Sequence, residues 1–211
     1  LLKDLGFEVV NKFKDKITCK MEKNNFSLYK KDKVKFINII AYDDMELMDY
    51  SLIFETIIAE DRTMAIVDYA HTPDALENVL ETIEELRRDE QRVVVVCGCG
   101  GDRDRSKRPE MAAIALRYAT TAIFTSDNPR TESAEAILDD MVAGVGDKSN
   151  YLRITDRREA IRTATMIAHA GDIIVVAGKG HEDYQIIGTT KHHFDDREEV
   201  RAAFTTTHKL N

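Results

Sequence analysis

From residue 63 onward, short apolar runs alternate along the chain with longer segments in which apolar residues recur every three or four positions. Continuous valine and isoleucine runs are typical of strands covered on both faces, and the longer segments are typical of amphipathic helices. The pattern predicts strands over 64–70, 92–98, 121–127, 151–155 and 172–178, and helices over 72–90, 110–119, 133–145 and 157–170. Strict alternation predicts an α/β fold with a Rossmann-like, mostly parallel sheet, whose ligands bind beyond the carboxyl ends of the strands.

The first 61 residues have a different pattern. Four short segments alternate apolar and polar residues, and turn clusters such as "EKNN" and "KKDK" separate them. They predict a small antiparallel β-rich or α+β module, with strands over 7–13, 16–22, 26–31 and 34–42. The stretch 43–61 opens with acidic residues and has apolar spacing near four, which predicts a helix. We find no chemical motif in this part.

Composition changes at the same place. Residues 1–61 contain ten lysines and no arginine, whereas residues 62–211 contain five lysines and fifteen arginines. Because lysine and arginine serve a solvated surface about equally well, physics does not demand this switch. We therefore predict two domains, 1–61 and 62–211. A natural or engineered fusion is one interpretation of the boundary, and a single lysine-rich domain that drifted in composition is the other.

Charge and cysteine content restrict the possible partners. The net charge of −8 and pI near 5.3 argue against a nucleic-acid partner. The chain has no apolar run near the roughly 18 residues of a membrane span and no signal-peptide pattern at its start, so we expect a cytoplasmic protein with no membrane partner. Cys97 and Cys99, two apart on a predicted strand, lack the spacing of a zinc site and are expected to be reduced packing residues.

Two unusual stretches follow the first two strands of this part. "DYAHTPDA" offers Asp68, His71 and Asp74 as hydrogen-bonding groups for a sugar or nucleotide, although Asp74 also suits the first turn of a helix. "GCGGDRDRSKRPE" combines three glycines with four basic residues, Arg103 among them, ahead of a helix N-terminus. Backbone amides and the helix dipole at such a place favour anions. A charged surface loop is the alternative interpretation.

Two further stretches follow later strands. In "SDNPRT", Asp127 can accept from an ammonium group, Asn128 can donate and accept, and Arg130 can bind a carboxylate through two nitrogens. Pro129 stiffens this turn. In "GKGHEDYQ", the glycines expose backbone groups and Glu182 can accept a hydrogen bond from an amine. Together the side chains are those that a zwitterionic amino acid requires.

Four motifs in this order resemble one family. "VDYAHTPDAL", "GCGGDRDRSKRP", "TSDNPRTE" and "GKGHEDYQ", closing with "FDDREEVRAAF", are similar to the C-terminal domain of the Mur ligases over about residues 63–205. These bacterial, cytoplasmic enzymes build peptidoglycan precursors for the cell wall. The "DNPR" stretch is that of the members that add meso-diaminopimelate rather than lysine to the UDP-linked muramoyl dipeptide.

The resemblance implies roles for individual residues. Those expected to bind meso-diaminopimelate are Arg103, Asp127, Asn128, Pro129, Arg130, Gly178 and Glu182. Those expected near the nucleotide are His71 and Asp74. No residue is assigned a catalytic or metal-binding role. Because meso-diaminopimelate differs from lysine by one carboxylate, Arg130 is the residue expected to discriminate between them.

The family reaction also needs parts that this sequence does not show. The intact enzymes use ATP and magnesium to activate the dipeptide carboxylate, and the phosphate-binding pattern GxxxxGK[ST] occurs nowhere in the chain. We therefore expect an amino-acid-binding domain that is not catalytic alone, holds no tightly bound cofactor, and meets ATP and the UDP-linked dipeptide only with further domains. Two alternatives stay open: a scaffold or binding fusion protein in which residues 1–61 carry the function, and a regulatory amino-acid sensor.

Overall fold

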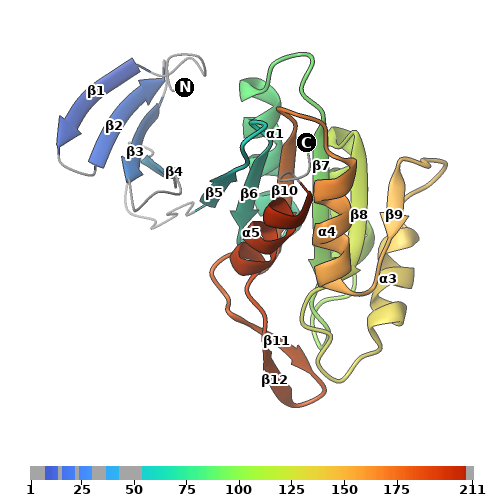
Figure 1. The fold of residues 1–211 in the computed structure, drawn as a ribbon. Helices are drawn as coiled ribbons and strands as arrows, with labels where there is room; N and C mark the ends of the chain where they lie inside the picture. Colours follow the sequence, from blue (N-terminus) through green and yellow to red (C-terminus); the bar gives the residue numbers. More distant parts are fainter. Residues whose placement is uncertain (1–7, 14–15, 22–23, 30–36, 43–53, 208–211) are drawn as a thin grey trace.

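The computed structural model of this 211-residue chain describes residues 8–13, 16–21, 24–29, 37–42 and 54–207. In the part from residue 54 onward, a twisted sheet lies between two layers of helices (Figure 1). None of the helices in these described ranges is long and apolar enough to cross a bilayer.

The four strands predicted before residue 43 are present. They are β1 (Glu8–Phe13), β2 (Lys16–Met21), β3 (Asn24–Tyr29) and β4 (Ile37–Tyr42). Each pairs with the next in antiparallel register, which confirms the predicted meander.

The helix predicted over 43–61 is wrong in its second half. Residues 54–58 form a strand, β5 (Phe54–Ile58), and the stretch 43–53 lies outside the described residues. β5 pairs antiparallel with the following strand and buries Thr56 and Ile57. A short apolar run fits a helix and a strand equally well in sequence, and here the edge of a neighbouring strand decided between them.

The predicted parallel sheet is confirmed. Its strands are β6 (Met64–Asp68), β7 (Val93–Cys99), β8 (Thr121–Ser126), β9 (Tyr151–Arg153) and β10 (Ile173–Ala177). Their spatial order is β6-β10-β7-β8-β9, so the last of these five strands along the chain lies between the first two of them. Alternation along β7 sends Val93, Val95 and Cys97 to one buried face and Val94 and Val96 to the other, as expected for a sheet covered on both sides.

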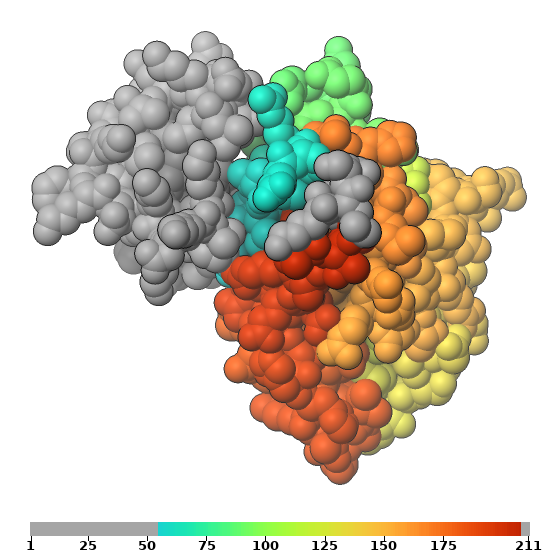
Figure 2. Space-filling model, in the orientation of Figure 1, coloured from blue at the N-terminus to red at the C-terminus, as the bar shows by residue number. Residues whose placement is uncertain are grey.

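Helices cover the two faces unequally. α1 (Pro73–Leu86), α2 (Lys107–Tyr118) and α3 (Ala134–Val142) pack on one face. α4 (Arg157–Ile167) and α5 (Asp196–Thr207) pack on the other, where Figure 2 shows them side by side in orange and red.

Local sequence explains where the helices begin. Thr72 caps α1 by accepting a hydrogen bond from the Ala75 amide, and Pro73 occupies the first helical position, as the sequence predicts. Asp156 caps α4 in the same way through the Glu159 amide.

Besides α5, for which the sequence pattern predicted no helix, two features were not predicted. β11 (Tyr184–Ile187) and β12 (Thr190–His193) form an antiparallel hairpin that projects from the carboxyl end of the sheet (Figure 1). The other feature is a charged pair inside the domain. Arg157, at the start of α4, donates from Nε and Nη2 to the Asp196 carboxylate at 2.7 Å each, and both side chains are 0% exposed.

The Arg157–Asp196 pair generates a stability prediction. Asp196→Asn leaves the guanidinium buried without a counter-charge, which costs about 3–5 kcal/mol in the free energy of unfolding. Glu199→Gln is the matched control, because Glu199, whose side chain is 15% exposed, pairs at 2.8 Å with Arg158, which is 59% exposed and stays solvated when the pair is broken. That change costs less than about 1 kcal/mol. Urea unfolding monitored by circular dichroism measures both; equal losses would show that burial does not distinguish the two pairs.

A second prediction concerns Asp68, the last residue of β6. Burial raises the pKa of Asp68 from 3.8 to about 6, although the Ala70 amide donates to its Oδ1 at 2.7 Å. The folded chain therefore binds this proton more tightly than the unfolded chain, and stability is lost as pH rises from about 4 to 6. Asp68→Asn removes that loss. The variant should exceed the wild type by about 1–3 kcal/mol at pH 7 and by progressively less toward pH 4.

Thermal unfolding of the wild type, Asp68→Asn and the exposed Asp89→Asn across this pH range tests the prediction. A stability difference that does not change between pH 4 and pH 7 would contradict it.

Candidate functional site

The loops after β6, β10, β7 and β8 meet at one edge of the sheet and surround a cavity of about 510 Å³. Parallel strands place their carboxyl ends together, as the predicted fold requires. The predicted site residues that line the cavity are His71, Arg103, Asp127, Asn128, Arg130, Gly178 and Glu182. The two others lie just outside: Asp74 is exposed on the first turn of α1, and Pro129 is buried with its carbonyl accepting from the Glu132 amide.

Arg130 has an unusual backbone conformation. Its φ is +52°, a left-handed conformation that is uncommon outside glycine. Two hydrogen bonds hold it there: its amide donates to the Ile186 carbonyl at 3.0 Å, and the Gly188 amide donates to its carbonyl at 2.7 Å. The hairpin therefore fixes the direction in which the Arg130 side chain leaves the loop.

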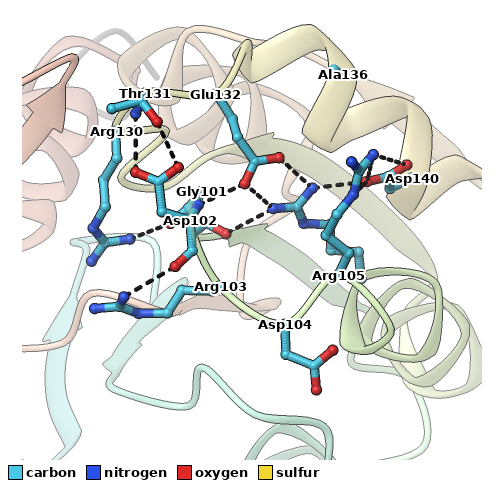
Figure 3. Close-up of polar contacts among 12 residues, drawn as sticks. Gly101, Asp102, Arg103, Asp104, Arg105, Arg130, Thr131, Glu132, Ala136 and Asp140 are labelled. Atoms are coloured by element: carbon cyan, nitrogen blue, oxygen red, sulfur yellow. Dashed lines mark hydrogen bonds and ion pairs between the residues drawn. The ribbon is translucent and has the colours of Figure 1, made fainter.

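The Arg130 guanidinium is anchored on one side only. Nη1 donates to the Gly101 carbonyl at 2.8 Å and to the Asn128 carbonyl at 3.4 Å. Among the described residues both of its hydrogen bonds use Nη1, so Nη2 and Nε remain for a ligand. Arg103 is held similarly, by Nη1 to the Asp102 carbonyl at 3.1 Å. Figure 3 shows the Arg103 and Arg130 guanidinium groups together on one side of the loops, whereas Arg105 points away toward Asp140.

A buried arginine joins the two loops that carry these cations. Arg108 is 0% exposed and donates to both carboxylate oxygens of Glu132, at 2.7 and 2.9 Å, and to Asp140 at 2.8 Å. The hydrogen bond from Arg108 lowers the pKa of Glu132 to about 2, so this clamp stays charged at neutral pH. Asp102 adds a second connection by accepting from the Thr131 hydroxyl at 2.7 Å.

The same two loops approach so closely that one position must be glycine. A Cβ on Gly101 would lie 1.9 Å from the Pro129 carbonyl oxygen, which no side chain tolerates. The glycines of "GCGG" therefore allow the basic loop to lie directly on the "DNPR" turn.

Acidic groups occupy another part of the cavity wall. Asp127 is 8% exposed, and burial raises its pKa while the charges of Arg157 and Lys179 oppose the rise. Glu182 is also partly desolvated, which raises its pKa, but hydrogen bonds from Asn128 and Lys179 outweigh this effect and lower its pKa below the ordinary value. The cavity thus presents guanidinium groups together with an ionised carboxylate.

An aromatic group at the cavity was missed from the sequence. Tyr69 is 43% exposed, and its ring centroid lies 4.6 Å from that of His71 and 5.2 Å from that of His181. Tyr184 also lines the cavity without having been predicted, whereas Lys107, which lines it too, is one of the four basic residues expected to favour an anion. Tyr69 follows Asp68 in the "DYAHTPDA" stretch and comes directly after β6. Its position at the carboxyl end of a strand was the signal in the sequence that could have identified it as a cavity residue.

The arrangement suits a ligand that carries both signs of charge. Two guanidinium groups can bind carboxylates, and Glu182 can accept from an ammonium group. In the part of the chain that the structure describes, no three His, Cys, Asp or Glu side chains are grouped so as to hold a metal ion. The groups at the cavity are those that could bind and orient an ionic ligand.

Comparison with known proteins gives a consistent family. The family model described as "Mur ligase, glutamate ligase domain" matches residues 54–180. The UDP-N-acetylmuramoyl-L-alanyl-D-glutamate–2,6-diaminopimelate ligase of Listeria monocytogenes is 57% identical over 150 residues, which is 71% of this chain and 30% of that protein. The protein of the same name from Parabacteroides distasonis is 55% identical over 155 residues, covering 72% of this chain and 32% of its own length.

A solved structure of a ligase with this name superposes with a TM-score of 0.69 at 38% identity, covering 92% of this chain and 43% of the solved chain. The chain thus spans about 30% of the length of the curated relatives it matches. The match to the family model and the identity to these relatives show that the chain belongs to the Mur ligase family and contains its glutamate ligase domain.

Proposed function

We propose that this chain is the amino-acid-binding domain of an ATP-dependent ligase that adds meso-diaminopimelate to the UDP-linked muramoyl dipeptide. The observation that carries the proposal is the free edge of the Arg130 guanidinium at a cavity that Glu182 also lines. The relatives named for 2,6-diaminopimelate, at 57% identity over this region, support the same substrate.

The proposed substrate contacts follow from charge. Arg130 and Arg103 bind carboxylates, and Asp127 and Glu182 accept hydrogen bonds from ammonium groups. Asn128, Pro129 and Gly178 shape the turns that carry these groups: a Cβ on Gly178 would lie 2.7 Å from Asp127 Oδ2, so only glycine leaves that carboxylate in place. Lysine lacks the second carboxylate and would leave one guanidinium unpaired, which costs affinity.

We place the nucleotide on the β6 side of the cavity. His71 lines it, and Asp74 lies three residues farther along, on the first turn of α1. In the intact enzyme ATP supplies the phosphoryl group that activates the dipeptide carboxylate. The amine of the bound amino acid then attacks the acyl phosphate, an amide forms and phosphate leaves. Among the described residues, no group of three acidic, His or Cys side chains could hold the magnesium ion that the intact enzymes use.

The domain boundary at residue 62 stays a prediction. Residues 62–211 make up 150 of the 211 residues, or 71%, yet the alignment with the solved ligase covers 92% of the chain. The alignment therefore reaches into residues 1–61. This coverage supports a ligase origin for at least part of that segment over a foreign module.

Calorimetric titration of the chain with meso-diaminopimelate and with L-lysine tests the proposal. The wild type should prefer meso-diaminopimelate, and Arg130→Ala should weaken its binding by about tenfold or more while changing lysine binding much less, because a charged hydrogen bond contributes about 1.5–3 kcal/mol.

Arg105→Ala is the matched control. It removes a guanidinium from the adjacent loop, but that group binds Asp140 outside the cavity and its side chain is 64% exposed. The control should retain the preference for meso-diaminopimelate. Equal affinities of the wild type for the two amino acids, or an equal loss in both variants, would refute the assignment; no binding of either would favour a scaffold role.

A further inference from the structure

Lys179 is a fully buried lysine whose charge the proposed reaction does not use. It lies between Gly178 and Gly180, and its side chain is 0% exposed. The two glycines have φ values of +120° and +52°, which other residues rarely adopt. A Cβ on Gly180 would also lie 2.7–2.9 Å from atoms of Tyr69. The "GKG" sequence is therefore a turn that directs a lysine side chain into the protein.

The ammonium group of Lys179 has an acceptor for each of its three hydrogens. Nζ donates to Asn128 Oδ1 at 3.3 Å, to Glu182 Oε2 at 3.1 Å and to the Tyr184 carbonyl. These acceptors belong to the "DNPR" turn, to the loop of Lys179 itself and to β11. Because all donors are satisfied and the side chain is inaccessible, Lys179 does not bind the ligand directly.

One consequence concerns the amide of Asn128. Oδ1 accepts from Lys179 and from the Ile186 amide at 2.8 Å, and Nδ2 donates to Glu182 Oε2 at 2.9 Å. An ammonium group donates only, so it holds the amide oxygen on its side and turns the amide nitrogen toward Glu182. One Nδ2 hydrogen is left for a ligand.

A second consequence concerns Glu182. Its Oε2 accepts from both Asn128 and Lys179, and the contact of its Oε1 is the Tyr184 hydroxyl at a long 3.5 Å. Oε1 is therefore the oxygen that can accept a strong hydrogen bond from outside. The Glu182 side chain is 17% exposed, and its residue lines the cavity.

We propose that Lys179 is a positioning residue, whose contact with Oε2 turns the Glu182 carboxylate so that Oε1 receives an ammonium group of the amino-acid substrate. This inference rests on the proposed function for the identity of the ligand. The effect of the Lys179 charge on the ionisation of Glu182 does not depend on the identity of the ligand, because the contacts of Lys179 exist in the chain without a ligand.

Several other groups influence Glu182. The Arg130 charge favours its ionised form, and so does the Tyr184 hydroxyl, which donates to Oε1 at 3.5 Å, whereas a negative charge on Asp127 or Tyr69 opposes it. Among the described residues, Lys179 is the cation that contacts this carboxylate directly. Its removal should raise the pKa of Glu182, whose carboxylate would then be lost as pH falls toward the acidic side of neutral.

The test begins with the ligand-free chain. Carbon-13 NMR titration of the glutamate side-chain carboxyls, assigned with Glu182→Gln, should give a wild-type Glu182 midpoint below that of an ordinary glutamate. In Lys179→Met, which keeps the length of the side chain but removes its charge, the midpoint should rise by about one pH unit or more. A wild-type midpoint at or above the ordinary value would overturn the proposal without any variant.

The second measurement is meso-diaminopimelate affinity between pH 5.5 and 8.5. Lys179→Met should bind at least about fivefold more weakly than wild type at the acidic end and recover toward the alkaline end. Glu182→Gln and the Lys179→Met/Glu182→Gln double variant should be equally weak, with no recovery. A loss that is uniform across pH in Lys179→Met would indicate a purely structural role and overturn the proposal.

Lys148→Met is the control for loss of a lysine. Lys148 also donates to a backbone carbonyl, that of Leu116 at 2.9 Å, but it lies away from the cavity and should leave the pH profile unchanged. If the wild type binds no meso-diaminopimelate at any pH, the proposed function fails, and the ligand-free titration still decides whether Lys179 controls Glu182.

Discussion

The loops of the cavity rest on one fully buried ion pair. Arg157 and Asp196 neutralise each other, and the guanidinium also donates to the carbonyls of Ala177 at 3.0 Å and Ser126 at 3.4 Å, at the ends of β10 and β8. Burying two charges is costly unless their donors and acceptors are satisfied, so displacing either strand end would expose an uncompensated charge. The pair therefore holds α4, α5 and the ends of both strands in one arrangement. Asp127 and Gly178 begin the loops that follow β8 and β10, so the same ion pair fixes where these two loops start.

At the cavity, the cationic and anionic groups are held by different hydrogen-bond partners. Arg130 is held by the Gly101 carbonyl and by the hairpin, and the loop that bears Gly101 is clamped by Arg108. Glu182 is held by Lys179 and Asn128. Because each group already has partners that fix its direction, a zwitterionic ligand does not have to order the side chains as it binds. In the proposed function, the free edge of the Arg130 guanidinium and Oε1 of Glu182 select the ligand.

Much of the site could be predicted because parallel strands place their carboxyl ends on one edge, so motifs that follow strands must meet. This reasoning located Arg130 and Glu182 correctly at the cavity. It missed Tyr69, which has no charge to attract attention, and it did not recognise the role of Lys179, since a lysine in a glycine-rich loop is usually solvated. It also predicted a helix where β5 forms, because the pairing that decides a short apolar run lies outside that run.

Sequence alone determined the element types between residues 64 and 178, since the period of apolar residues follows directly from helix and strand geometry. It also determined the chemical character of the site through the residue types that follow each strand. Tertiary structure alone decided that β10 lies between β6 and β7, which brings the "GKG" turn beside the "DNPR" turn. It decided the left-handed conformation of Arg130 and the burial of Lys179 as well. These features depend on hydrogen bonds between residues more than fifty positions apart, which no local pattern encodes.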